Sequence, residues 1–233
     1  MNIQSFARRL VAALTAGIAL CAAPLTFATT VTLHPTGFAN GFSESFDFTG
    51  EPFGPVPTGG FTGTINLDPT PITFFCFDLG HTFSFGTPYQ YDDSIQTGGK
   101  FDELSQLFTE GFASATSTAD FSAGFQLAVW EILMQTTPDD VNSPDGSFYV
   151  TDAHGNTGAV TRANTLLAGL SSYTPDYTIH LLHSLDTSPQ HQDFVYGTQP
   201  LTQVPEPAPL ALVAIGMIGL FALRRRIIAK RTA

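Results

Sequence analysis

Hydrophobic and polar residues alternate in the first third of the chain, which is typical of β-strands. Four short segments there are rich in Phe, Thr, Val and Ile and are separated by Gly or Pro, as strands joined by turns are. A Pro- and Gly-rich stretch at residues 50–60 is expected to be a loop. The pattern predicts an antiparallel sheet that contains residues 30–38, 43–50, 61–68 and 72–79.

The middle of the chain changes to helical spacing. Apolar residues recur at intervals of three and four, so each segment can bury one face as a helix. This pattern covers residues 101–112, 119–135 and 160–170. Strand patterns return at residues 177–185 and 193–197. We therefore expect an α+β fold, an antiparallel β-sandwich or barrel with a helical insert.

Both ends of the chain carry targeting patterns. Residues 1–28 have a basic start, an apolar run and a small-residue exit, the layout of a secretory signal peptide. Residues 29–185 are then the exported domain, and the more polar residues 186–204 are expected to be a linker. Residues 205–233 are a tail whose apolar run ends in basic residues. Those charges stay cytoplasmic, so the domain faces outward.

A Pro-Glu-Pro motif opens the tail and an arginine cluster closes its apolar run: Pro205, Glu206, Pro207, Arg224, Arg225 and Arg226. The run between them has 16 residues, at 208–223, against roughly 20 in a comfortable transmembrane helix. A short permanent anchor is one interpretation. In motif order, spacing and position the tail resembles the PEP-CTERM sorting signal of Gram-negative bacteria. That resemblance implies a transient transmembrane helix in the inner membrane, removal of the tail by an exosortase-type protease, and transfer to the cell surface or extracellular matrix.

Charge is distributed unevenly along the chain. All 20 acidic residues but only 2 of the 9 Lys and Arg residues lie within residues 29–207, a net charge of 2 − 20 = −18. Such a surface repels phosphate backbones, so nucleic acid is excluded as a partner. It suits a solvated extracellular domain, or one that meets cations.

Cys76 is the only cysteine left once the signal peptide, which contains Cys21, is removed. A lone cysteine in a secreted protein is a packed core residue, one half of an intermolecular disulfide, or a reactive group. Alternation places Cys76 on one strand face with Phe74 and Asp78, and Phe75 on the other. Composition alone favours a small buried residue.

Gln126 lies beside the apolar stripe of the helix predicted at residues 119–135. Its neighbours in "FQLAVW" are apolar or aromatic, including Phe125 and Trp130. Burying a carboxamide there is costly unless the amide has hydrogen-bond partners. One interpretation is an amide at the edge of the core that is bonded to backbone groups.

The segments "FCF" around Cys76 and "FQLAVW" around Gln126 resemble the thioester domains of bacterial surface proteins. The resemblance implies that Cys76 supplies the thiol and Gln126 the acyl group of an internal thioester, with loss of ammonia. It also implies a covalent adhesin, because an amine of a surface or matrix protein could attack the bond. Apolar neighbours would keep water from the acyl group, and four aromatic residues are expected to do so: Phe75, Phe77, Phe125 and Trp130.

Two function classes stay open, a covalent surface-binding module and a non-reactive structural protein of a biofilm or exopolysaccharide. The sequence has no nucleophile elbow, phosphate-binding loop or HExxH motif, so neither an enzyme nor a cofactor is expected. His180 and His183 fall on opposite faces of a predicted strand, so no metal site is expected there. Asp92 and Asp93 are adjacent and would also point apart.

Overall fold

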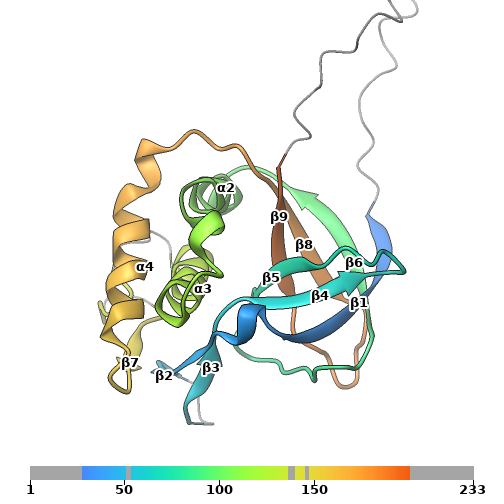
Figure 1. The fold of residues 1–233 in the computed structure, drawn as a ribbon, viewed down its shortest axis with the longest axis horizontal. Coiled ribbons are helices and arrows are strands. Elements are labelled where there is room, and N and C mark those ends of the chain that lie inside the picture. Colours follow the sequence, from blue (N-terminus) through green and yellow to red (C-terminus); the bar gives the residue numbers. More distant parts are fainter. Residues whose placement is uncertain (1–27, 51–53, 136–139, 145–146, 200–233) are drawn as a thin grey trace, which may run out of the picture.

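A barrel of six strands forms one side of the molecule in the computed structural model, which describes residues 28–50, 54–135, 140–144 and 147–199 (Figure 1). The strands are hydrogen-bonded in the order β1-β4-β5-β9-β8-β6 and close on themselves. Every neighbouring pair is antiparallel. Their bounds are β1 Thr29–Phe38, β4 Phe61–Ile65, β5 Ile72–Cys76, β6 Tyr89–Gln96, β8 Thr178–Ser184 and β9 Phe194–Thr198.

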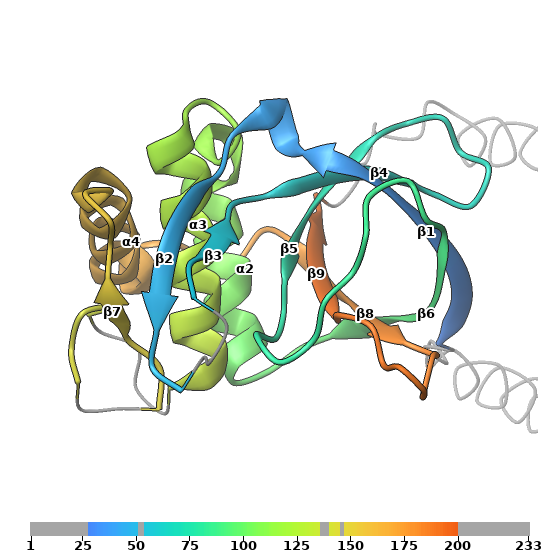
Figure 2. The ribbon, with the colours of Figure 1, turned by 90° about the horizontal axis from the view of Figure 1, so that it is seen from below.

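Three helices and a small sheet form the other side. The helices are inserted between β6 and β8 in sequence, and the small sheet has the order β3-β2-β7. Figure 2 shows β2 and β3 running across α3, which they contact. The bounds are α2 Lys100–Gly111, α3 Ala119–Met134, α4 Thr157–Gly169, β2 Glu44–Phe48, β3 Val56–Thr58 and β7 Val150–Asp152.

The helix α3 is buried on nearly all sides, as a helix in the centre of a core is. It begins at a capping residue, Thr118, whose hydroxyl accepts a hydrogen bond from the N–H of Phe121 at 3.2 Å. Gly124 lets α4 approach closely, since a Cβ there would lie 2.7 Å from the carbonyl oxygen of Ala159. These features fix α3 between α4 and the barrel.

The strand β5 is the wall that the barrel and the helices share. On its barrel face, the ring of Phe74 lies 4.9 Å from that of Phe194, centroid to centroid. On its other face, the ring of Phe75 lies 4.6 Å from that of Phe125 in α3. Both faces of β5 are therefore buried, although its side chains alternate as the sequence predicts.

The structure confirms the α+β class and, of the two architectures expected, it has the barrel with a helical insert. The predicted helices and strands are present within a few residues of their expected bounds. Three strands are absent from the prediction: β6, β7, and β3 within the expected loop at 50–60. The expected linker at 186–204 contains β9, whose Phe194 is fully buried, so the folded barrel extends through Thr198.

The expected signal peptide, except for Ala28, and the whole expected tail lie outside the described residues. Within the described ranges, no helix has the length and apolar character needed to cross a membrane. The transmembrane helix expected in residues 205–233 therefore stays a prediction.

Candidate functional site

Cys76 and Gln126 meet where β5 contacts α3. The N–H of Cys76 donates a hydrogen bond to Oε1 of Gln126 at 2.8 Å, and Nε2 of Gln126 donates to the carbonyl oxygen of Cys76 at 3.0 Å. Both residues are buried, with exposures of 5% for Cys76 and 0% for Gln126. The carboxamide is thus held on the backbone of the residue that carries the thiol.

The barrel topology explains why this backbone is available. The pairing of β4 with β5 runs only from Gly63↔Ile72 to Phe61↔Phe74, so no residue of β4 opposes Cys76. Gly60, which precedes the first residue of β4, instead donates its N–H to the hydroxyl of Ser122 in α3 at 2.9 Å. The amide of Gln126 takes the place of the missing peptide group, because it offers one acceptor and one donor as a strand would.

The surroundings keep the thiol protonated. Burial raises the pKa of Cys76 well above its usual range, and the negative charge of Asp78 raises it further, while a hydrogen bond with the Gln192 side chain acts in the opposite direction. The Asp78 carboxylate is itself fixed by the N–H groups of His81 at 3.1 Å and Asp193 at 3.0 Å.

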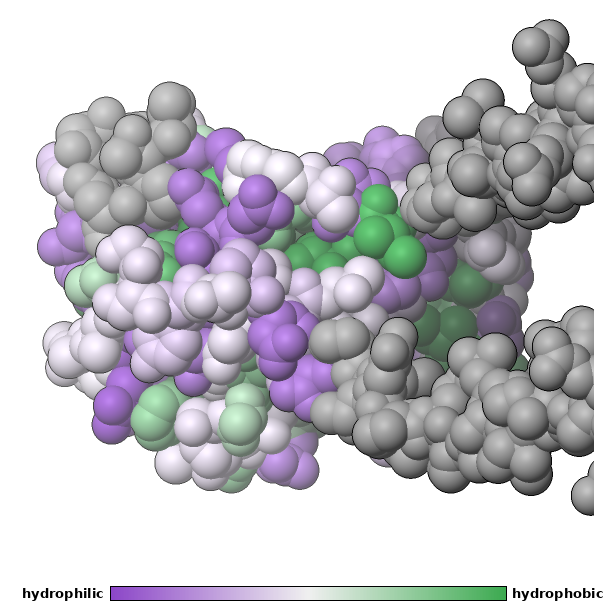
Figure 3. All heavy atoms as spheres, turned by 90° about the horizontal axis from the view of Figure 1, so that it is seen from above, coloured by the Kyte–Doolittle hydropathy of each residue, from purple (hydrophilic) through white to green (hydrophobic). Residues whose placement is uncertain are grey.

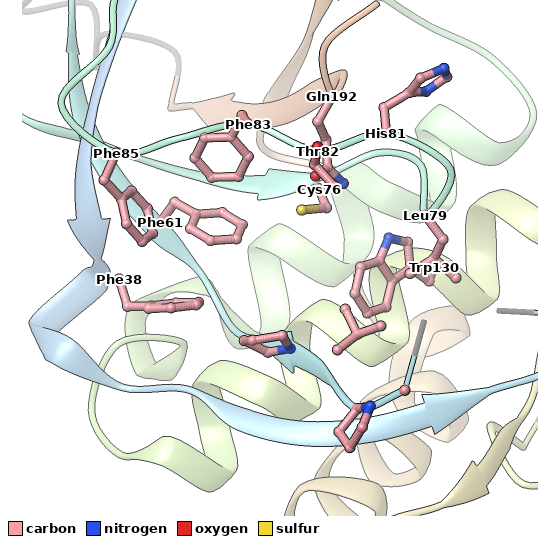
Figure 4. Close-up of a pocket in the computed structure, with 14 residues that line it drawn as sticks. Phe38, Phe61, Cys76, Leu79, His81, Thr82, Phe83, Phe85, Trp130 and Gln192 are labelled. Atoms are coloured by element: carbon pink, nitrogen blue, oxygen red, sulfur yellow. The ribbon is translucent and has the colours of Figure 1, made fainter. Parts of the chain in front are cut away.

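A cavity of about 360 Å³ opens beside the thiol. Buried Cys76 and Trp130 line its inner end, and the exposed residues Pro55, Thr82 and Phe85 line its outer end. Figure 4 shows the sulfur of Cys76 on the side of the cavity and the ring of His81 turned away from it. The thiol therefore faces an open space and is not paired with this imidazole.

The four aromatic residues expected to shield a thioester take different places. Trp130 lines the cavity together with Cys76. Phe75 and Phe125 pack against each other with tilted rings on the helical side of β5, and Phe77 is only partly buried. The cavity also has walls that the sequence did not single out: Phe38, Phe61, Phe83, Phe85, Leu79 and Gln192.

Residues 203–226 match the PEP-CTERM protein-sorting motif. The motif covers the predicted Pro-Glu-Pro segment and the arginine cluster, and it implies export and processing by an exosortase. No curated protein matched the chain.

A solved structure, the N-terminal domain of the Streptococcus pyogenes pilus tip adhesin Cpa, is 12% identical, with a TM-score of 0.45. The match covers 76% of this chain and 96% of the streptococcal one. A similarity this distant carries no information about activity.

The other predicted polar residues form separate networks. Nδ1 of His180 lies 3.0 Å from Oδ1 of Asp93, and Nδ1 of His183 lies 2.8 Å from Oδ2 of Asp193. The two histidines therefore have different carboxylate partners. One group in the described ranges brings potential metal ligands within 4.8 Å of one another: Asp47, Asp152 and His154. It lies at the surface, where His154 is already 3.2 Å from the Asp47 carboxylate.

The surface of the domain is polar and poor in basic groups. Figure 3 shows a face on which hydrophilic and intermediate residues predominate and hydrophobic residues occupy small areas. Lys100 donates from Nζ to the carbonyl oxygen of Leu133 at 2.6 Å, and the Arg162 guanidinium lies 4.1 Å from the centre of the Phe121 ring. The only lysine of the exported part is thus occupied at the end of α3.

Proposed function

We propose that this protein is an exported surface protein that attaches covalently to amines through a thioester between Cys76 and Gln126. The observation that carries the proposal is the pair of hydrogen bonds that holds the Gln126 carboxamide on the Cys76 backbone. The sorting motif supports the route: export, transient anchoring in the inner membrane, removal of the tail by an exosortase, and transfer of the protein to the cell surface or matrix.

The chemistry follows from these contacts. In the forming step, the Cys76 sulfur attacks Cδ of Gln126, the C–N bond breaks, and the thiol proton leaves with the nitrogen as ammonia. The Cys76 N–H points at Oε1, where negative charge develops in the tetrahedral intermediate, so it acts as an oxyanion donor. In the second step a primary amine attacks the same carbon, the C–S bond breaks, and the sulfur takes up the amine proton.

The environment limits competing reactions of the thioester. Aromatic residues around β5 and α3 limit the access of water to the acyl carbon. The lone lysine of the exported part, Lys100, is hydrogen-bonded elsewhere and does not compete as a nucleophile.

A second candidate is a non-reactive structural protein of a biofilm or exopolysaccharide matrix. The same two hydrogen bonds favour it, because they give both polar atoms of the buried Gln126 amide a partner without any reaction. In that case Gln126 only completes the open end of the β4–β5 pairing.

Intact-mass measurement of the exported domain separates the two candidates. A thioester makes the native chain lighter by one ammonia. Methylamine then opens the bond, adds the mass of one methylamine at Gln126 and frees the thiol of Cys76. Cys76→Ala and Gln126→Ala should each abolish both signals. Gln135→Ala is the matched control, because Gln135 is also a buried glutamine at the end of α3 that bonds to backbone groups, those of Ser147 and Phe148. A native mass equal to that of the unmodified sequence would leave the structural candidate.

A further inference from the structure

The cavity beside Cys76 has the composition of a binding site for an apolar group. None of its lining residues in the described chain is Asp, Glu, Lys or Arg. The rings of Phe83 and Phe85 pack edge to face 5.3 Å apart, and Phe83 lies 5.1 Å from Phe61, so the wall is continuous and aromatic. Such concave aromatic walls bind apolar side chains, and a few polar groups fix their orientation.

Trp130 supplies such a polar group. Its side chain is 1% exposed, yet Nε1 has no hydrogen-bond partner among the described residues. A buried donor without a partner is rare in folded proteins, and this one belongs to a residue at the inner end of the cavity. A ligand with a carbonyl oxygen close to its attacking amine could accept a hydrogen bond from Nε1 of Trp130.

The uncharged lining of the cavity also favours an attacking amine in its neutral form over the same amine in its ammonium form. No carboxylate lines the cavity. Asp78, whose charge acts on the Cys76 thiol, already accepts hydrogen bonds from the N–H groups of His81 and Asp193, and only a neutral amine is a nucleophile. At pH 7.5 roughly a third of α-amino groups are neutral, against about one lysine side chain in a thousand. The surface charge of the exported part still attracts cationic molecules to the domain.

We propose that the cavity accepts the α-amino group of an N-terminus that begins with a large apolar residue. This proposal rests on the proposed thioester, and it names the amine that receives the acyl group of Gln126. The side chain fills the aromatic cavity, and the carbonyl oxygen next to the α-amine accepts from Nε1 of Trp130. Gln126 does not itself line the cavity, so the amine reaches its Cδ at the thioester bond, whose other end, Cys76, does. The new bond is an amide, the C–S bond breaks, and the amine proton passes to the Cys76 sulfur.

The rate of thioester opening tests this acceptor with small probes followed by mass. L-Phenylalaninamide should react at least about 10-fold faster than glycinamide, since a benzyl group is buried, and faster than Nα-acetyl-lysinamide at pH 7.5. Trp130→Phe should slow L-phenylalaninamide roughly 2- to 10-fold more than it slows 2-phenylethylamine, which has no carbonyl; this factor corresponds to one neutral hydrogen bond. Equal rates for L-phenylalaninamide and glycinamide, with the thioester present, would overturn the acceptor and leave the proposed function intact.

Fluorescence provides a test that needs no thioester. Trp130 is the only tryptophan of the chain, so its emission reports on the cavity. After methylamine treatment no reactive bond is left, whether or not one formed. L-Phenylalaninamide should then change the emission saturably, glycinamide should not, and Phe83→Ala should weaken the binding. An emission that L-phenylalaninamide leaves unchanged would overturn the cavity as its site, whatever the mass of the native chain.

Discussion

The thioester would act as a cross-link between β5 and α3, and its contribution to stability follows from the structure. Cys76 and Gln126 are separated by 50 residues, and closing a loop of that length in the unfolded chain stabilises the fold by about 4 kcal/mol in the chain-entropy model. Methylamine removes only the cross-link, so the opened wild type should lose this amount. Cys76→Ala should lose roughly 1 kcal/mol more, because a small buried side chain is also removed.

Urea unfolding of the native, methylamine-opened and Cys76→Ala proteins measures these differences. With a slope of about 2 kcal/mol per molar urea, the midpoint should fall by about 2 M on opening. Gln126→Ala should be the least stable, because it also leaves the buried N–H and C=O of Cys76 without partners, about 1–3 kcal/mol for each group. Coincident curves for the native and methylamine-treated wild type would refute the cross-link.

Three further outcomes are expected. Burial, together with a hydrogen bond to Asp120 and the charge of Asp120, raises the pKa of Glu44 to about 7. In the unfolded chain this carboxyl group loses its proton near pH 4. The folded state therefore holds the proton between about pH 4 and 7, and the free energy of unfolding falls as the pH rises through this range. Glu44→Gln should match the wild type at pH 4 and exceed it at pH 8 in urea unfolding; equal differences at both pH values would contradict this. Native protein should react slowly with thiol reagents, because Cys76 is buried; rapid complete labelling would exclude both a thioester and a buried thiol. Peptide mapping of the surface form should recover neither residues 1–28 nor Arg224–Arg226.

Most helices and strands whose own residues show a clear hydrophobic periodicity were predicted from the sequence. β5 and α3 have clear periodicities, so Cys76 and Gln126 could be placed on a strand and a helix before their contact was known. β6 was missed because the tyrosines of "YQYDDSIQ" are followed by three polar residues in a row. Only barrel closure shows that Tyr89 and Tyr91 point inward and are buried.

The cavity could not be predicted from the sequence. Its walls come from five separate parts of the chain, at residues 38, 54–61, 76–85, 130 and 192, and no sequence period links these parts. The open backbone of Cys76 depends on where the β4–β5 pairing ends, which is a property of the assembled sheet. One face of β5 is buried only because the helices cover it, and the alternation of side chains along the strand does not predict that burial.

The position of Gln126 in the chain sets how the domain would carry a mechanical load. A partner attached at α3 and an anchor beyond β9 pull on the segment from residue 126 to residue 199, while residues 28–125 lie outside the covalent line of force. That segment includes β8 and β9, which are held between β6 and β5 in the closed barrel. Rupture therefore requires these strands to leave the barrel, and the freed segment would lengthen the tether by at most about 250 Å. Under flow, the tether would therefore stay short until the load is large enough to pull β9 out of the barrel.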